Sequence, residues 1–281
     1  IKNYQIMQCF LVMPDMHLCI YKVLLGMKKT ILVTGSTGVI GLSISHFFYQ
    51  KGFNVIINGK CKPSQLRDVK KKFNNKRALF FNCDLTKTAN VKKIVKSSLS
   101  KFKKIDVLVN CAGIQFVESI EKYPETVWRK MMDINLTTPF LFIKEVLPFM
   151  KKNKWGRIIN IASTHGLIGS KKKSAYTASK HGLVGLTKVV ALETAEENIT
   201  CNSICPGFVL TELIQDQIDT ISKNKNIKLK DAEIELLREK QPSLKFVKKE
   251  QIAQLAYFLC TSSASEITGS SISIDGSWTA Q

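Results

Sequence analysis

Hydrophobic positions after residue 30 fall into two alternating patterns. Short runs are continuously apolar and rich in β-branched residues, as expected of parallel strands that are buried on both faces. The longer segments between them repeat their apolar positions with helical spacing. The predicted strands are residues 30–34, 54–58, 78–83, 107–110, 157–162, 200–204 and 271–274. The predicted helices are residues 40–51, 88–102, 124–151, 176–197 and 249–260.

This alternation predicts an α/β protein with a Rossmann-like, doubly wound parallel sheet. The chain has 281 residues, of which 44% are hydrophobic, so one large core can form, and we expect a single domain over residues 27–281. Residues 210–246, approximately, are charged and helix-prone and follow the carboxyl end of a strand, where open α/β sheets bind ligands. We interpret this interval as a helical substrate lid, with an ordinary surface hairpin as the alternative.

The first 26 residues follow neither pattern. They are apolar but interrupted by Pro14, Asp15 and His17, which makes a poor membrane span, and they lack the composition of a cleaved signal. Met27 stands directly before the first predicted strand. We expect residues 1–26 to be an N-terminal extension that is disordered or not native, with an interfacial or targeting segment as the alternative.

The formal net charge of +20 comes almost wholly from lysine. The lysines are dispersed and no nucleic-acid-binding motif accompanies them, so we predict a solvated basic surface without a nucleic-acid or membrane partner. The eight cysteines show neither a Cys-x-x-Cys pair nor zinc-ligand spacing, so we predict no metal site and a reducing, cytoplasmic location. Four cysteines lie in apolar runs and are expected to be buried: Cys111, Cys201, Cys205 and Cys260.

A glycine-rich segment joins the first predicted strand to the first helix. Gly35, Gly38 and Gly41, with Thr37 and Ile40 among them, permit a tight turn and close approach of the backbone to a phosphate. The free N–H groups at the helix N-terminus favour an anion there. The segment therefore predicts the pyrophosphate site of a dinucleotide.

The ends of the second and third strands leave the choice of dinucleotide open. Residues 58–60 offer no acidic side chain for a ribose 2′-hydroxyl, and Lys60 would suit a 2′-phosphate. Asp84 and Leu85 are candidate adenine contacts, with a turn-capping aspartate as the alternative.

Tyr176 and Lys180 are spaced i and i+4 in a predicted helix, so their side chains share one helix face. Oxidation of a secondary alcohol needs a base for the hydroxyl proton. A phenol with a pKa of about 10 is a poor base at neutral pH unless nearby positive charge lowers that pKa. The Lys180 ammonium, together with a positively charged nicotinamide ring nearby, is the candidate for that charge. Ser163 follows a predicted strand and is placed to hydrogen-bond the reacting oxygen.

The order of these features resembles the short-chain dehydrogenase/reductase family. After the glycine loop come Asn110-Cys111-Ala112-Gly113, Asn135, Ser163, Tyr176-x-x-x-Lys180 and Pro206-Gly207. The resemblance implies a nicotinamide cofactor, a homotetramer, and a catalytic set of Asn135, Ser163, Tyr176 and Lys180, with Asn135 holding a water that links the lysine to solvent. It also implies cofactor contacts at Gly35, Thr37, Gly38, Ile40, Gly41, Asp84, Leu85, Asn110, Ala112, Gly113, Tyr176, Lys180, Pro206, Gly207, Val209 and Thr211.

The glycine loop departs from the family pattern at one position. The family commonly reads Thr-Gly-x-x-x-Gly-x-Gly, whereas this chain has Gly38 followed by Val39. A β-branched residue tolerates positive φ badly, and its methyl groups would crowd a dinucleotide. We expect weakened, but not abolished, cofactor binding.

Several segments resemble bacterial D-3-hydroxybutyrate dehydrogenases more specifically, namely residues 112–115, 161–167, 173–176, 239–244 and 275–280. This resemblance implies NAD-dependent, reversible oxidation of D-3-hydroxybutyrate to acetoacetate. It implies that Gln115, His165, Lys173 and Gln217 hold the substrate carboxylate and that Trp278 closes the pocket. A small buried carboxylate needs a cation and several hydrogen-bond donors, and this set would supply them.

Two other functions compete with this interpretation. A 3-oxoacyl-carrier-protein reductase has the same fold and catalytic set, and its NADPH would suit Lys60. The carboxylate-binding set and the lid weigh against it, because an acyl thioester needs an open channel. The second alternative is a non-catalytic family member that acts as a binding scaffold, which the altered glycine loop favours.

Overall fold

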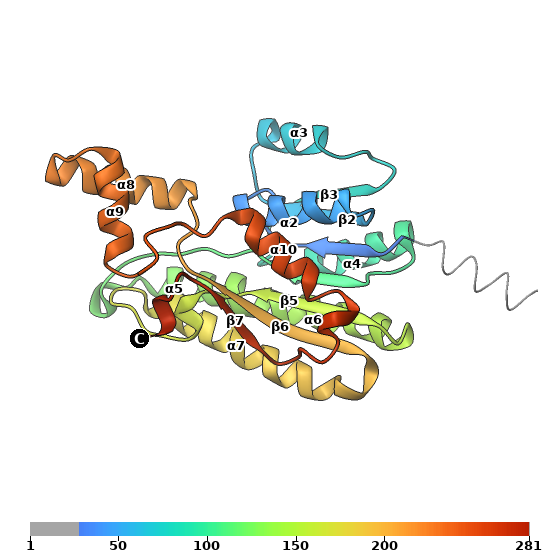
Figure 1. Ribbon diagram of the computed structural model, residues 1–281. Helices are drawn as coiled ribbons and strands as arrows, with labels where there is room; N and C mark the ends of the chain where they lie inside the picture. The colour runs from blue at the N-terminus through green and yellow to red at the C-terminus, as the bar shows by residue number, and fades with distance from the viewer. Residues whose placement is uncertain (1–27, 281) are drawn as a thin grey trace, which may run out of the picture.

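A seven-stranded parallel sheet with helices on both faces forms the centre of the computed structural model, which describes residues 28–280 (Figure 1). The strand order is β3-β2-β1-β4-β5-β6-β7. The strands are β1 (Thr30–Val33), β2 (Asn54–Gly59), β3 (Ala78–Asn82), β4 (Val107–Asn110), β5 (Gly156–Ile161), β6 (Ile199–Pro206) and β7 (Ser271–Ile274). The helices are α2 (Val39–Gln50), α3 (Pro63–Lys71), α4 (Thr88–Phe102), α5 (Glu125–Met132), α6 (Thr138–Lys152), α7 (Ser174–Glu193), α8 (Glu212–Lys225), α9 (Leu229–Arg238) and α10 (Lys249–Phe258). The predicted doubly wound α/β fold is confirmed; the predicted extension, residues 1–26, lies outside the described residues.

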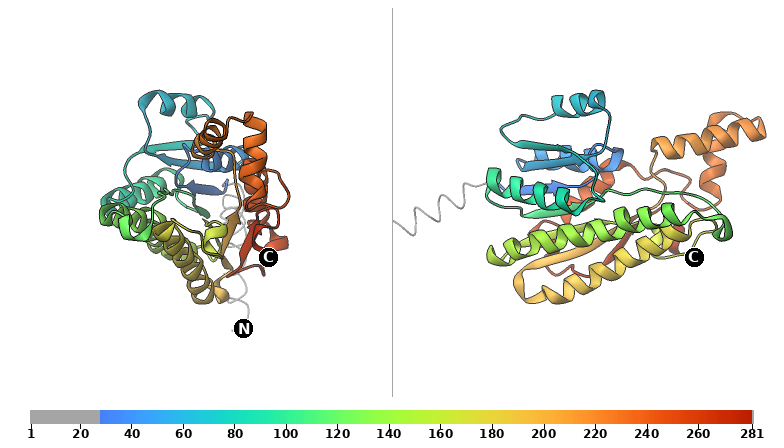
Figure 2. Two further views of the ribbon diagram at one scale, coloured as in Figure 1. Left: turned by 90° about the vertical axis from the view of Figure 1, so that its left-hand side faces the viewer. Right: turned by 180° about the vertical axis from the view of Figure 1, so that it is seen from behind.

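Side chains of the central strands alternate between two cores. Ile31 and Val33 of β1 pack in one cluster with α2 and α10, whereas Leu32 packs in a second cluster with α4 and α6. Figure 2 shows these helices on the two faces of the sheet. Burial on both faces explains why the strand sequences are continuously apolar.

Two helical segments differ from the prediction made from the pattern. Residues 124–151, predicted as one helical segment, are divided into α5 and α6 by a π-helical turn, Asp133–Thr137. Such turns are commonly found at functional sites, and the spacing of apolar positions does not reveal them. The sequence pattern also misses α3, because Val69 is the single buried residue of that helix and its apolar face is correspondingly narrow.

The predicted lid interval contains α8 and α9, which project beyond the sheet at the carboxyl ends of the strands (Figure 1). These helices share a small apolar cluster in which Ile218 and Leu237 pack with Phe208 and Trp278. The lid interval therefore packs on the C-terminal segment as well as on itself. Over residues 28–280, no helix has both the length and the apolar character needed to cross a membrane.

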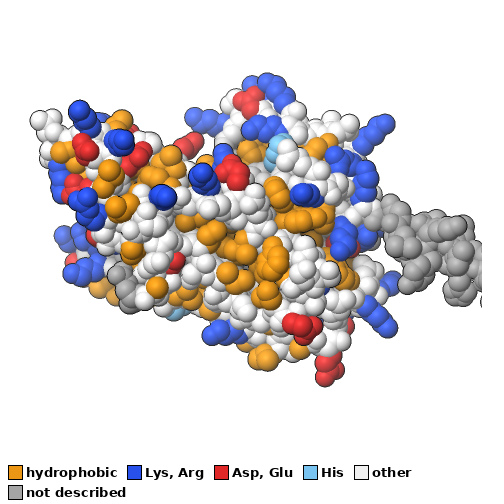
Figure 3. Space-filling model, viewed as in Figure 1, with side chains coloured by type: hydrophobic (Ala, Val, Ile, Leu, Met, Phe, Trp, Pro, Cys, Tyr) orange, Lys and Arg blue, Asp and Glu red, His pale blue; other side chains and the backbone are white. Residues whose placement is uncertain are grey.

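Basic side chains are scattered over the face of the molecule drawn in Figure 3 and do not form one patch there. This distribution agrees with the predicted solvated, lysine-rich surface.

Candidate active site

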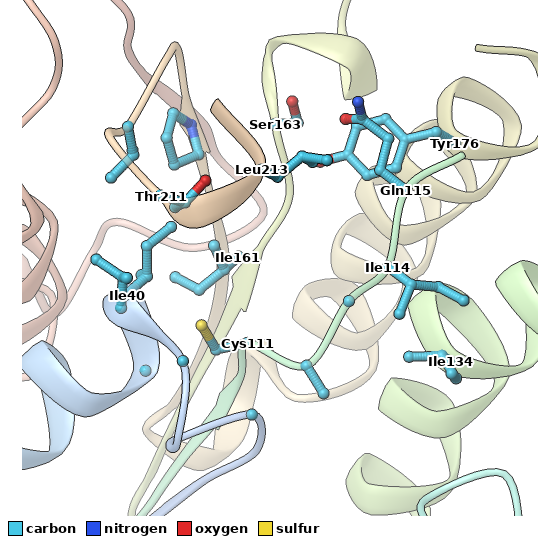
Figure 4. Close-up of a pocket in the computed structure, with 18 of the residues that line it drawn as sticks. Ile40, Cys111, Ile114, Gln115, Ile134, Ile161, Ser163, Tyr176, Thr211 and Leu213 are labelled. Atoms are coloured by element: carbon cyan, nitrogen blue, oxygen red, sulfur yellow. The ribbon is translucent and has the colours of Figure 1, made fainter. Parts of the chain in front are cut away.

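A cavity of about 710 Å³ opens at the carboxyl edge of the sheet, where the strand order reverses between β1 and β4. Ligands of doubly wound folds bind at this kind of position, because the loops after the two strands diverge there. In Figure 4, Ser163 and Tyr176 lie in the upper part of the pocket, and Ile40 and Cys111 lie in the lower part. The predicted site residues that line it are Gly35, Thr37, Gly38, Ile40, Gly41, Asp84, Leu85, Ala112, Gly113, Gln115, Ser163, His165, Lys173, Tyr176, Lys180, Pro206, Gly207, Val209, Thr211 and Trp278.

Three predicted site residues do not line this cavity: Asn110, Asn135 and Gln217. Sequence reasoning in turn missed several apolar wall residues, including Ile114, Ile134, Leu213 and Ile214. An apolar side chain carries no chemical signal that separates a cavity wall from a core. Only the fold could identify these positions.

Two glycines fold the phosphate loop tightly. Gly35 adopts a φ of +64°, and a Cβ there would lie 2.7 Å from the Cα of Ala112. A Cβ on Gly41 would lie 2.5 Å from the carbonyl oxygen of Gly35. Gly38 differs, because its φ is −86° and a Cβ would meet one neighbouring atom, at 3.4 Å. The close approach of the loop to the rest of the cleft therefore depends on Gly35 and Gly41.

Val39 begins α2 and does not have a positive φ. The expected backbone strain at Val39 is therefore wrong, because Gly35 is the loop residue with left-handed backbone. The Val39 side chain does line the cavity, so crowding of a dinucleotide stays a prediction. Val39, Ile40 and Gly41 form the first turn of α2, whose N–H groups lack partners within the helix and whose side chains include no acid. This turn fits an anionic pyrophosphate.

Thr34 connects the loop after β1 to the loop after β4. Its Oγ1 accepts hydrogen bonds from the N–H groups of Cys111 and Ala112, each at 3.0 Å. Asn110 lies buried inside the sheet, where its Nδ2 donates to Asn160 Oδ1 at 2.8 Å. Asn110 thus anchors the start of the loop after β4 within the sheet.

Cys111 is only partly buried and lines the cavity, so the expectation that it is a buried small hydrophobe is wrong. It follows the last residue of β4, where the chain leaves the sheet and enters the cleft. The other three cysteines predicted to be buried are buried: Cys201, Cys205 and Cys260.

Asp84 and Lys60 form an ion pair at the opposite end of the cavity from Tyr176. The Lys60 Nζ lies 2.6 Å from Asp84 Oδ2, while Asp84 Oδ1 accepts from the N–H and Oγ1 of Thr86. The Lys60 ammonium, followed by the Thr86 donors, holds the pKa of Asp84 well below its usual range. Asp84 is therefore both a turn-capping residue and a lining residue, and its negative charge faces Lys60.

Helix α7 places Tyr176 and Lys180 on the cavity wall. Lys180 is buried, its Nζ donates to the carbonyl oxygen of Ile161 at 2.7 Å, and it lies 5.7 Å from the centroid of the Tyr176 ring. Ser163 lines the same cavity as Tyr176 and Lys180. The hydroxyl of Ser163, the phenol of Tyr176 and the ammonium of Lys180 therefore belong to one cavity, beside β5 and α7.

Burial raises the pKa of the Tyr176 hydroxyl, and the hydrogen bond from Ser163 opposes that rise. Burial also lowers the pKa of Lys180 to about 8. Desolvation disfavours the charged forms of both groups, so the expected lowering of the phenol pKa depends on the positive nicotinamide ring as well as on Lys180. A second positive charge is needed beside Tyr176 to favour its phenolate.

Asn135 lies in the π-helical turn and is fully buried. Its Oδ1 accepts from the N–H of Ile114 at 2.9 Å, and its Nδ2 donates to the Ile114 carbonyl and to Ser179 Oγ. The side chain therefore fixes the cavity-lining segment that holds Ile114 and Gln115 against α7.

Lys173 and His165 line the end of the cavity that holds Tyr176, which is the end predicted to bind substrate. Lys173 is 9% exposed, and burial, with the nearby charge of Lys240, lowers its pKa to about 8. His165 Nδ1 lies 3.2 Å from Ser163 Oγ, while its Nε2 is buried without a partner among the described residues. Burial, followed by the charge of Lys173, lowers the pKa of His165 to about 3, so the imidazole is neutral at pH 7. An unpartnered buried donor or acceptor beside an ammonium is suited to a polar ligand.

Aromatic rings close this end of the cavity. Trp278 is buried, stacks at a tilt on Phe208 with ring centroids 4.8 Å apart, and contacts the ring of His165 edge-on at 5.5 Å. The His165 ring also meets the Tyr176 ring edge-on at 5.6 Å. Within residues 28–280, no group of three or more His, Cys, Asp or Glu side chains is placed to hold a metal ion.

Known proteins share this arrangement. A sequence model described as short chain dehydrogenase matches residues 29–222. The chain is 43% identical over 258 residues to a D-beta-hydroxybutyrate dehydrogenase of Rhizobium meliloti, covering 91% of this chain and 100% of the relative. It is also 43% identical over 254 residues to a D-beta-hydroxybutyrate dehydrogenase of Cupriavidus necator, covering 90% of this chain and 98% of the relative.

A solved structure shares the fold of this chain. An actinorhodin polyketide ketoreductase crystallised with NADPH superimposes with a TM-score of 0.82 at 28% identity, covering 89% of this chain and 97% of that chain. The cleft at the strand switch point, the glycine loop and the Ser163, Tyr176 and Lys180 cluster agree with this likeness. The chain belongs to the short-chain dehydrogenase family of oxidoreductases.

Proposed function

We propose that this protein oxidises D-3-hydroxybutyrate reversibly to acetoacetate with NAD. One observation carries the proposal: the buried Lys173 and the unpartnered Nε2 of His165 share a cavity with Tyr176 and Ser163. A carboxylate bound by Lys173 and His165 would place its own alcohol carbon close to the phenol of Tyr176. The names of the two bacterial relatives support the same substrate.

The residues present fit a nicotinamide dinucleotide. The first turn of α2 offers its N–H groups to the pyrophosphate, and Gly35 and Gly41 allow close approach. Asp84 and Leu85 would contact the adenosine half, and residues 206–211 would flank the nicotinamide half. When bound, the nicotinamide accepts the hydride that leaves the alcohol carbon and carries a positive charge in its oxidised form.

The catalytic residues would then handle the proton. The Tyr176 phenolate accepts the hydroxyl proton of the alcohol, and Ser163 donates a hydrogen bond to the oxygen on which charge develops. Lys180 stabilises the phenolate together with the positive charge of the oxidised cofactor, which provides the second charge that burial of Tyr176 makes necessary. Asn135 would hold the water through which Lys180 exchanges protons with solvent, while its side chain keeps Ile114 in place.

The substrate carboxylate would be held by Lys173, His165 and Gln115, with Trp278 against the methyl end. If Thr164 Oγ1 donates to His165 Nδ1, from which it lies 3.4 Å away, the proton of the neutral imidazole resides on Nε2, which is then a donor for the carboxylate. The hydroxyl proton of Ser163 is then left for the reacting oxygen. Gln217 lies on α8 and would need the lid to move toward the cavity before it could contribute.

A 3-oxoacyl-carrier-protein reductase that uses NADPH is the second candidate, and the position of Lys60 favours it. Lys60 lines the cavity and its side chain is 69% exposed, so it is accessible to a 2′-phosphate. Against this, Asp84 already pairs with Lys60 and would repel a phosphate there. We therefore prefer NAD.

A panel of steady-state rates separates the two candidates. Acetoacetate with NADH is expected to be reduced faster than an acetoacetyl thioester with NADPH, and the reverse preference would overturn the proposal. If calorimetry detects no binding of either dinucleotide, the non-catalytic scaffold becomes the better interpretation.

The proposal extends to assembly and location. Helices α6 and α7 carry exposed apolar side chains, namely Phe140 and Phe149 on α6 and Val189 and Leu192 on α7. Exposed apolar surface of this kind supports assembly into a homotetramer. Light scattering tests this state.

The cysteines within residues 28–280 are all free thiols, which supports a location in the reducing cytoplasm.

A further inference from the structure

A second cation, Lys240, lies close to the substrate end of the cavity and has no role in the chemistry above. Its side chain is 28% exposed, and its Nζ lies 6.0 Å from the centroid of the Trp278 ring. That ring is the one that contacts His165 edge-on. The Lys240 ammonium and the His165 ring therefore both lie next to Trp278.

The backbone beside Lys240 is held firmly at the base of the lid. Gln241 is fully buried, its Oε1 accepts from the N–H of Phe208 at 2.8 Å, and its Nε2 donates to the carbonyl of Lys245. The N–H of Ser243 donates to the carbonyl of Gly276 at 3.1 Å. These bonds tie the segment after α9 both to the exit of β6 and to the turn before Trp278. These hydrogen bonds therefore hold the segment that carries Lys240 in place.

Positive charge exceeds negative charge around this position. The ammonium groups of Lys173 and Lys240 repel each other, since the charge of Lys240, after burial, lowers the pKa of Lys173. The same charge also lowers the pKa of His165. The carboxylate of Glu239 lies 3.4 Å from the Lys240 Nζ, but its side chain is 68% exposed. Two cations near a dry pocket favour an anion in that pocket, because an anion relieves their repulsion.

We propose that Lys240 is a second specificity-determining cation of the substrate site and acts with Lys173 to select alcohols that carry a carboxylate. The inference rests on the proposed function. Lys173 binds the carboxylate from inside the pocket, and Lys240 raises the positive potential from its position next to Trp278. Glu239 competes for Lys240 in the free protein and lowers that potential.

Substitution of Lys240 tests the proposal against a matched control. Lys240→Met is expected to raise the KM for D-3-hydroxybutyrate about tenfold and to change kcat less than about twofold, because the charge acts on ground state and transition state alike. For 2-butanol, an alcohol of similar size without a carboxylate, kcat/KM should not change. Lys230→Met removes an equal charge from an exposed position on α9 and should leave both substrates unaffected. Equal KM values in the Lys240→Met and Lys230→Met proteins would overturn the proposal.

The pH dependence of KM separates a charge effect from a packing defect, because a packing defect alone would not shift the pH at which KM rises. The groups acting on Lys173 are Lys240, which lowers its pKa, and Glu239, which raises it. Lys240→Met should therefore shift the rise of KM for the carboxylate to higher pH, whereas Lys240→Arg should keep the wild-type profile. An unchanged profile in Lys240→Met would contradict a charge effect.

Failure of the inference and failure of the proposed function would give different experimental results. If the wild-type protein oxidises no 3-hydroxy acid, the proposed function fails, and quenching of Trp278 fluorescence by added acetoacetate then reports anion binding directly. Weaker quenching in Lys240→Met than in Lys230→Met would still support the second cation. If the wild type is active and the two variants behave alike, the inference alone fails.

Discussion

The two ends of the cavity are built from different chemical material. The cofactor end consists of backbone, glycines and one ion pair at its rim, with Gly35 and Gly41 packed against neighbouring main chain. The substrate end consists of buried polar side chains, among them Lys173 and His165, whose pKa values burial shifts strongly. A dinucleotide at the first end would be recognised by shape and by N–H groups, whereas the proposed small acid at the second end would be recognised by charge that is placed at the cost of desolvation. Substitutions at the two ends should consequently affect different quantities, the dinucleotide Kd at one end and the substrate KM at the other.

The largest effect is expected where the two ends meet. Tyr176→Phe removes the proton acceptor and should lower kcat by about 10³-fold, while the Kd for the dinucleotide stays within about twofold. Stopped-flow rates and calorimetry measure the two quantities. Retained turnover would dismiss Tyr176 as the base.

The substrate end should respond through KM. Lys173→Met should raise KM for D-3-hydroxybutyrate by roughly 10- to 100-fold, the range of a hydrogen bond to a charged group, and leave the dinucleotide Kd unchanged. In the wild type, Lys173 is positively charged below its pKa of about 8, so KM should be low at pH 7 and rise as the pH passes through 8. A flat KM between pH 7 and pH 9 would show that the charge of Lys173 does not bind substrate.

The cofactor end should respond through the dinucleotide Kd. Gly41→Ala brings a Cβ against the Gly35 carbonyl and the Ser36 backbone, so the loop must move, and the Kd should rise at least about tenfold. Gly38→Ala is the matched control, because its Cβ meets one atom at an ordinary distance, and its Kd should stay near wild type. Equal losses in both variants would mean that the loop geometry does not set affinity.

The smallest expected effect concerns Val39. Its backbone is helical, so the effect of Val39→Gly is limited to relief of side-chain crowding in the cavity, and the dinucleotide Kd should fall by about two- to fivefold. Calorimetry with each dinucleotide measures this change. Weaker binding after the substitution would show that the valine methyl groups contact the cofactor favourably.

Local features of the fold and of the candidate site were predictable from the sequence. The apolar strand runs, the glycine loop and the i, i+4 spacing of Tyr176 and Lys180 each depend on neighbouring residues, and the structure places all of them as predicted. The π-helical turn at Asn135 and the narrow helix α3 were not predictable, because neither leaves a clear periodic trace.

By itself, the sequence determined which chemical groups are available and the fold that brings strand ends to one edge, since periodicity and chirality dictate both. Only the tertiary structure decided the environment of those groups. It buries Tyr176 enough to raise its pKa, brings Cys111 into the cavity, leaves Gln217 outside it, and places Lys240 and His165 next to the same ring, that of Trp278. Desolvation and through-space charge depend on residues far apart in the chain, and for that reason no local pattern encodes them.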